Sequence, residues 1–170
     1  KDNLSWTFKL RQGIKFANGD ALTAKDAKLS IEQLILPDSA SAFSGTVRSD
    51  VKSMELIDEY TLKVTTNGTR PFFPWGVTAA QGSEGMIIPT DHVKSVGEQA
   101  FGQRAFGSGP YKVVELKAGA ELVLEAWGEH WREGVPKYKQ VRYLIVPEES
   151  TRIAFLSTKQ ADTADVSRER

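Results

Sequence analysis

The chain has 170 residues, of which 40% are hydrophobic and 26% are charged, with 22 basic and 22 acidic side chains. This is the balance of an ordinary globular protein, and a net charge of zero without a long basic run gives no sign of a nucleic-acid-binding surface. The sequence contains no cysteine, which excludes disulfides, thiolate nucleophiles and cysteine-ligated metals.

The first third of the chain carries clear strand and helix patterns. Residues 5–11 alternate, with Trp6, Phe8 and Leu10 on one face, and predict a half-buried strand. A turn is indicated by Asn18-Gly19. Thr23 is followed three residues later by an acid, as in a capping box, and predicts the start of a helix. Its apolar face comprises Ala27, Ile31, Leu34 and Ile35, and Pro37 should end it.

The middle of the chain alternates loops with short elements. Residues 38–49 are small and polar and predict a loop with one aromatic, Phe43. Two alternating runs over residues 51–66 predict a hairpin that turns at Asp58-Glu59. Residues 85–89 indicate a short apolar strand, and residues 91–101 a helix capped by Thr90.

A glycine- and proline-rich corner, Gly107–Pro110, precedes the last elements. Residues 111–116 and 121–127 predict a second hairpin, residues 140–147 an apolar strand, and residues 148–160 a helix. Hairpins and helices are mixed without β-α-β regularity, so the expected fold class is α+β.

The sequence shows no catalytic or cofactor-binding pattern. His92 and His130 have no metal-like spacing, and the neighbouring Glu148 and Glu149 do not converge by spacing alone. Nucleophile-elbow, phosphate-loop and dinucleotide motifs are missing. We therefore expect no enzyme activity, no catalytic residues, no metal and no cofactor. For Phe43 two roles remain open, because a loop aromatic can fold onto the core or contact a ligand.

The order of several motifs along the chain resembles that of bacterial extracellular solute-binding proteins of family 5, the peptide-, dipeptide- and nickel-binding components of ABC importers. These motifs are Leu10-Arg11, Gly13–Phe16, Asn18-Gly19, Leu22–Asp26, Ile57–Leu62, Ile88-Pro89, Gly107–Tyr111, Trp131 with Gly134 and Pro136, and Pro147 with Ser150–Arg152 and Asp162. The resemblance covers essentially the whole chain. Departures are Ala17, where the family usually has histidine, and Lys159-Gln160, where it has Gly-Glu.

The resemblance implies a mixed-sheet, type II (class C) periplasmic binding protein fold, of which this chain is an N-terminal fragment. Residues 1–106 would be most of an accessory domain and residues 107–170 part of ligand-binding lobe I, with the second lobe absent. The corner at Gly107–Pro110 would mark the passage between the two. The absence of a signal-peptide pattern and of an initiator methionine also favours a piece of a longer protein.

The implied function is capture of peptides, or a related small solute, in the periplasm or at the cell surface by a free or lipid-anchored protein. The solute would then pass to ABC permease subunits in the membrane. The alternative is an interaction or sensory module built on the same domain. Ligand-contacting positions implied by the resemblance are Phe43, Asp165 and Val166. Glu149 is a further candidate because it lies just after the apolar strand, and strand ends commonly face a cleft. Two alternatives stay open: Glu149 as a charge at the start of a helix, and Asp165 in a solvated loop. We expect no nucleic-acid partner, and self-association of the fragment where the missing lobe would have covered it.

Overall fold

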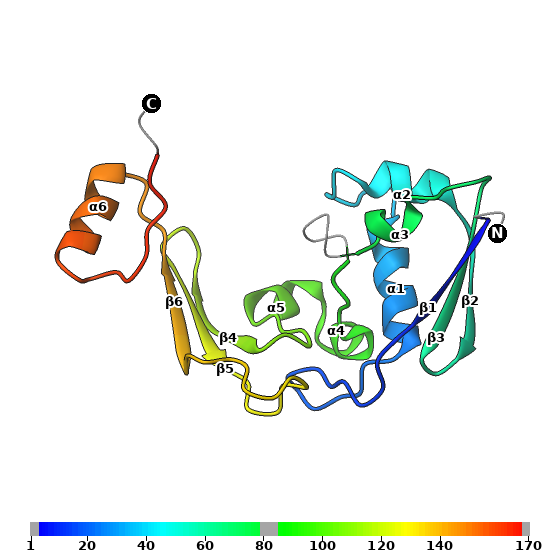
Figure 1. The fold of residues 1–170 in the computed structure, drawn as a ribbon, viewed down its shortest axis with the longest axis horizontal. Coiled ribbons are helices and arrows are strands. Elements are labelled where there is room, and N and C mark those ends of the chain that lie inside the picture. The colour runs from blue at the N-terminus through cyan, green and yellow to red at the C-terminus, as the bar shows by residue number, and fades with distance from the viewer. Residues whose placement is uncertain (1–3, 79–84, 168–170) are drawn as a thin grey trace.

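The computed structural model describes residues 4–78 and 85–167. Within them lie two three-stranded antiparallel sheets, one toward each end of an elongated molecule (Figure 1). The N-terminal sheet has the strand order β1-β3-β2 and the C-terminal sheet the order β4-β5-β6. This mixture of helices with antiparallel sheets confirms the predicted α+β class.

The elements follow in this order. The N-terminal part contains β1 (Ser5–Lys9), α1 (Ala24–Leu34), α2 (Ser44–Asp50), β2 (Val51–Asp58), β3 (Thr61–Thr66) and α3 (Phe73–Gly76). The connection between the sheets contains α4 (Thr90–Val96) and α5 (Glu98–Gln103). The C-terminal part contains β4 (Tyr111–Lys117), β5 (Glu121–Ala126), β6 (Gln140–Leu144) and α6 (Glu149–Ser157).

The main hydrophobic core lies between the N-terminal sheet and α1. The central strand β3 contributes Leu62 and Val64, which are at most 1% exposed. In the antiparallel register, Phe8 of β1 lies opposite Leu62 and Trp6 opposite Val64. The alternating pattern of residues 5–11 therefore marks a real strand with its apolar face on the core. The buried members of this core are Ala24, Ala27, Ile31, Val47, Leu62, Val64 and Phe73.

The capping box predicted for α1 is confirmed. The backbone N–H and the hydroxyl of Thr23 both donate to Asp26 Oδ2, at 3.0 and 2.9 Å. An Asp at this position satisfies donors that the first helical turn cannot pair internally. The helix ends at Leu34, shortly before the proline that was expected to stop it.

The loop predicted over residues 38–49 is wrong in its second half, because Ser44–Asp50 forms α2. Small polar residues give this segment weak helical preference. The helix is stabilised by tertiary contacts instead: Val47 is buried in the main core, and Arg48 donates to the carbonyls of Ile35 and Leu36 at 2.6 and 2.5 Å.

The short strand predicted for residues 85–89 is also wrong. This segment runs beside α1 without pairing to a sheet, and the Ile88 N–H donates to the hydroxyl of Ser30 on that helix at 3.0 Å. Because a side chain takes the place of a strand partner, the apolar residues are used for packing rather than for a ladder. Ile87 accordingly packs against the main core and against a second, smaller cluster of Ile14, Phe16 and Leu22.

The single helix predicted for residues 91–101 is divided into α4 and α5 by Gly97, whose φ of 85° and ψ of 152° are open only to glycine. The predicted cap at Thr90 is wrong as well. Thr90 is the first residue of α4, and its hydroxyl donates to Asp26 Oδ1 at 2.9 Å. This contact joins the start of α4 to the start of α1.

The predicted hairpin of β4 and β5 is confirmed, with Gly119 in the turn at a φ of 71°. The Gly107–Pro110 corner precedes β4 and is held by two backbone hydrogen bonds. The Ala17 N–H donates to the Gly107 carbonyl at 3.0 Å, and the Trp127 N–H donates to the Pro110 carbonyl at 2.9 Å. The corner therefore connects the turn at Ala17–Gly19, here called the N-terminal turn, with the end of β5, where Trp127 is buried.

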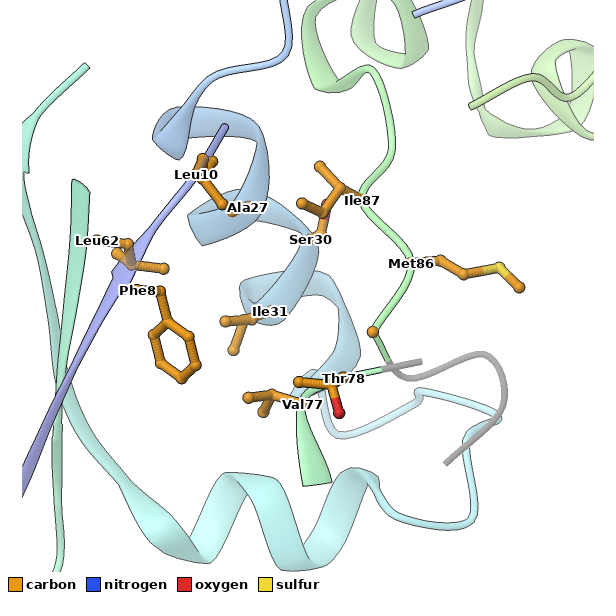
Figure 2. A pocket seen from close by; sticks show the side chains of 11 residues that line it. Phe8, Leu10, Ala27, Ser30, Ile31, Leu62, Val77, Thr78, Met86 and Ile87 are labelled. Carbon is orange, nitrogen blue, oxygen red and sulfur yellow. The ribbon is translucent and has the colours of Figure 1, made fainter. Parts of the chain in front are cut away.

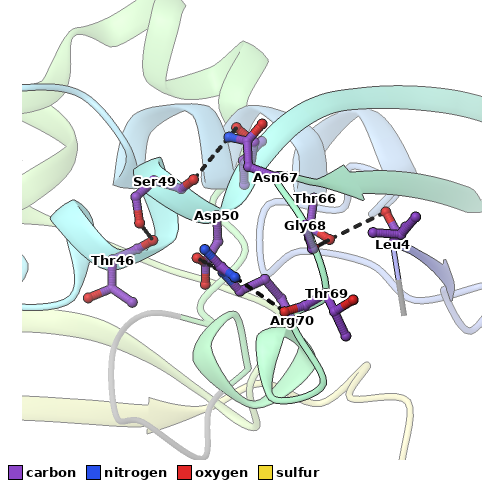
Figure 3. Close-up of polar contacts among 10 residues, drawn as sticks. Leu4, Thr46, Ser49, Asp50, Thr66, Asn67, Gly68, Thr69 and Arg70 are labelled. Atoms are coloured by element: carbon purple, nitrogen blue, oxygen red, sulfur yellow. Dashed lines mark hydrogen bonds and ion pairs between the residues drawn. The ribbon is translucent and has the colours of Figure 1, made fainter. Parts of the chain in front are cut away.

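A polar network closes the far end of the N-terminal sheet (Figure 3). Arg70 donates to the Asp50 carboxylate, and the Asn67 side chain donates to the carbonyls of Ser49 and Val51 at 2.9 and 3.3 Å. These residues follow β3 and lie across the junction of α2 with β2. The network holds α2 against the sheet that supports it.

Candidate ligand-binding site

Three of the four predicted ligand-contacting residues come together at the C-terminal end of the structure. Glu149 is the first residue of α6, and Asp165 and Val166 lie in the extended segment that follows this helix. One carboxylate oxygen of Glu149, Oε1, accepts a hydrogen bond from the Ser167 N–H. The start of the helix and the terminal segment are thus held side by side.

The fourth member of this cluster is Arg152, which the sequence indicated only as part of a Thr-Arg motif. Its Nε donates to the Asp165 carbonyl at 2.7 Å. Its Nη1 donates to the carbonyls of Val146 and Pro147 at 2.7 and 2.6 Å. One guanidinium therefore connects the exit from β6 with the terminal segment. Because Asp165 is held through its backbone, its carboxylate remains exposed to solvent.

Phe43 is not brought near these residues. It immediately precedes α2, and α2 and α6 lie at opposite ends of the molecule (Figure 1). Phe43 is 39% exposed and is not part of the hydrophobic clusters. Its backbone is fixed, since its N–H donates to the Ser41 hydroxyl at 3.2 Å and its carbonyl accepts from the Val47 N–H at 3.0 Å. The ring is therefore presented from an ordered helix start.

An apolar hollow of about 210 Å³ lies beside α1 (Figure 2). Mostly apolar side chains from β1, β3, α1 and residues 77–78 and 85–87 line it, including Phe8, Ile31 and Met86. The hydroxyls of Ser30 and Thr78 at its edge already donate to backbone carbonyls, at 2.7 and 3.1 Å. The hollow thus has little with which to recognise a polar solute.

The carboxyl groups with shifted pKa values belong to ion pairs or to a turn. The hydrogen bond from Arg142, followed by that from Lys117, lowers the pKa of Glu121. The hydrogen bond to Lys25 lowers the pKa of Asp91, and the Tyr60 N–H lowers that of Asp58. Within residues 4–78 and 85–167, no group of three or more histidine and acidic side chains could hold a metal ion. No helix in the described ranges has the length and apolar character needed to cross a membrane.

The fold and the sequence both place the chain in a class of solute-binding proteins. The family model of the bacterial extracellular solute-binding proteins, family 5 Middle, matches residues 1–169. The chain therefore belongs to this family, as its motifs predicted.

Among curated relatives, a probable D,D-dipeptide-binding periplasmic protein of Escherichia coli (strain K12) is 32% identical over 169 residues, covering 96% of this chain. A glutathione-binding protein of Pectobacterium atrosepticum is 28% identical over 166 residues, with the same coverage of this chain. This chain spans 31% of the length of each. These proteins are named for the solutes they bind, which does not favour the alternative of an interaction or sensory module.

Solved structures give the same result. The binding protein MoaA of A. tumefaciens R10, in complex with mannopinic acid, matches with a TM-score of 0.83 at 31% identity over 95% of this chain and 32% of that chain. A nickel ABC transporter protein of Bacillus halodurans matches with a TM-score of 0.78 at 28% identity over 95% of this chain and 31% of that chain. The expected type II periplasmic binding protein fold is confirmed.

Proposed function

We propose that this chain is part of the solute-binding component of an ABC importer, which captures a peptide or peptide-like solute outside the cytoplasmic membrane and delivers it to the permease. The observation that carries the proposal is the cluster at the start of α6, where Arg152 and Glu149 hold the segment of Asp165 and Val166 in place. Pre-ordered polar and apolar groups at one end of a lobe suit a binding surface.

In this proposal the chain supplies two parts of a longer, two-lobed protein. Residues 1–106 form most of an accessory domain, and residues 107–170 form part of lobe I. The second lobe would close over the solute by a hinge motion and bury its other side. The protein would work in the periplasm or at the cell surface, free or anchored by lipid, and would bind its solute without chemical change.

The cluster offers groups that fit the ends and side chains of a peptide. Glu149 uses Oε1 for the Ser167 N–H, which leaves Oε2 for the amino group of a bound peptide. The exposed carboxylate of Asp165 is a second acceptor, and Val166 supplies apolar contact. Phe43 would pack on an extended solute from the accessory domain without recognising particular side chains. Peptides are the favoured cargo because the curated relatives are named for a dipeptide and for glutathione.

The first test is to purify the full-length protein, release its ligand and identify it by mass spectrometry. Affinity for that ligand is then measured for Phe43→Ala, Glu149→Gln and Asp165→Ala. Each loss of a contact in a closed site should cost roughly 1–3 kcal/mol, which weakens binding about 5- to 150-fold. The matched controls are Glu148→Gln, a neighbouring exposed carboxylate, and Phe72→Ala, an aromatic that is 79% exposed.

The controls should bind within twofold of the parent protein. If all three site variants fold normally and also bind within twofold, this placement of the site is wrong. If the released ligand is instead converted to a product, and one substitution abolishes the conversion, the protein is an enzyme and the transport proposal fails.

A further inference from the structure

A second hollow, of about 290 Å³, lies where four separate segments meet. Ala17 and Asn18 come from the N-terminal turn, His92 from α4, Arg104 and Phe106 from the segment after α5, and Lys112 from the start of β4. This hollow shares no residue with the cluster around Glu149 or with Phe43. It is therefore a feature separate from the proposed cargo contacts.

The break at Gly97 brings together two residues that line this hollow, His92 and Phe106. Because α4 and α5 are two helices, the chain turns back and places the His92 ring 5.0 Å from the Phe106 ring and 6.2 Å from the Phe101 ring. The aromatic cluster fixes the segment that carries Arg104. A continuous helix over residues 91–101 would have directed this segment elsewhere.

The charge lining the hollow is positive. Among the residues that the structure describes, no carboxylate lies within ion-pair distance of Arg104. Lys112 has one acidic neighbour, Glu125, whose oxygen is 3.8 Å from Nζ and thus beyond hydrogen-bond distance. The acidic Asp20 near the turn is engaged by the side chain of Asn18.

We propose that this hollow binds a small anion that carries a carboxylate or phosphate group. The guanidinium of Arg104 and the ammonium of Lys112 would form charge-assisted hydrogen bonds with its oxygens. Asn18 and His92 line the hollow beside them, and the Phe106 ring supplies an apolar surface for an organic anion. A partly exposed pair of cations predicts weak, millimolar binding rather than tight capture.

The anion would connect the N-terminal turn, the segment after α5 and the start of β4. The backbone hydrogen bond from the Ala17 N–H to the Gly107 carbonyl already connects the first two of these segments. A ligand that binds only the folded state raises the free energy of unfolding. The anion should therefore stabilise the junction between the two sheets.

The test is a titration of the isotope-labelled full-length protein, followed by NMR of its backbone amides, with sodium phosphate in one arm and sodium succinate in the other. Sodium chloride at matched ionic strength is the reference. We expect saturable shifts centred on the amides of Asn18, Phe106 and Lys112, together with a rise in melting temperature. A stronger response to phosphate indicates a phosphorylated solute, and a stronger response to succinate indicates a carboxylate.

Three variants make the test specific. Arg104→Gln with Lys112→Gln should weaken binding at least about tenfold, whereas Lys52→Gln with Lys137→Gln removes the same charge from exposed positions outside the hollow and should change it less than twofold. Ala17→Glu introduces a carboxylate at the hollow without altering either cation, and should abolish anion binding in a folded protein. Shifts spread over the surface, or equal binding by the first pair and its control, would overturn the proposal.

Discussion

Asp26 joins the start of α1 to the start of α4, beside the ion pair between Lys25 of α1 and Asp91 of α4. Its carboxylate accepts from the N–H and hydroxyl of Thr23, and from the N–H and hydroxyl of Thr90 at 3.3 and 2.9 Å. The residue is buried, so these donors have no ready access to water in its absence. A buried carboxylate with several donors costs more to remove than an exposed cap.

We therefore expect Asp26→Ala to lower the free energy of unfolding by about 3 kcal/mol. Urea denaturation followed by circular dichroism measures this directly. The control is Asp38→Ala, because Asp38 is exposed in the turn after α1, and it should change stability by less than about 0.5 kcal/mol. Equal effects of the two substitutions would show that Asp26 has no special role in joining the helices.

At the scale of elements, the connection between α4 and α5 depends on one backbone conformation. An added Cβ at Gly97 would meet no atom within 4 Å, so a side chain fits there sterically. The obstacle is the φ of 85°, which residues with a Cβ rarely adopt. The strain therefore lies in the backbone itself.

Gly97→Ala should destabilise the chain by about 1–3 kcal/mol. Gly102→Ala is the matched control: Gly102 lies within α5 without a positive φ, and its added Cβ also meets open space. That substitution should leave stability unchanged or raise it by up to about 1 kcal/mol. Thermal unfolding of both variants separates the two cases, and a neutral Gly97→Ala would mean that the helix break is not fixed by glycine.

The C-terminal sheet contains a second element-scale feature, the buried carboxylate of Glu121 on β5. Arg142 of β6 and Lys117 of β4 both contact it, and these hydrogen bonds lower its pKa. A lowered pKa in the folded state means that the unfolded state binds the proton more readily. The hydrogen bonds of the Glu121 carboxylate therefore stabilise the folded state fully above its ordinary pKa of 4.5. This stabilisation is lost as the pH falls through the lowered pKa.

The stability difference between the parent chain and Glu121→Gln should therefore be largest near neutral pH and shrink below pH 4.5. Urea unfolding at a series of pH values from about 6 to about 3 measures it. Glu133→Gln, at an exposed loop position, should show no such trend. A difference that does not change with pH would refute the role assigned to the ion pairs.

At the scale of the whole molecule, the two sheets are buried to different extents. The N-terminal sheet carries the main core, whereas the C-terminal sheet buries only Val123 among the hydrophobic residues of its strands. On its other face, Leu116, Leu122 and Tyr143 form a cross-strand row in which Leu116 and Tyr143 are 41% and 55% exposed. An apolar row of this kind favours coverage by another surface.

We expect the isolated 170-residue chain to self-associate through this row and to bind the cargo weakly or not at all, because the site needs its second lobe. Light scattering after size exclusion should give a mass that rises with concentration. Leu116→Ser with Tyr143→Ser should abolish the rise, and Phe72→Ser, directly before α3, should not. Micromolar cargo binding by a monomeric chain would contradict both expectations.

The sequence by itself determined the elements whose signals are local. Alternation predicted β1 and both hairpins, the Thr23–Asp26 spacing predicted the start of α1, and the order of motifs predicted the family. These patterns can be recognised in the sequence because strand periodicity, helix capping and turn chemistry depend on residues only a few positions apart.

Only the tertiary structure decided the features that depend on distant contacts. α2 exists because Val47 and Arg48 meet the core and the end of α1, and residues 85–89 are not a strand because Ser30 pairs with Ile88. The link between Arg152 and Asp165 and the basic hollow likewise join segments that no local pattern relates. Propensity is a weak local preference, and burial or a hydrogen bond from a remote residue outweighs it.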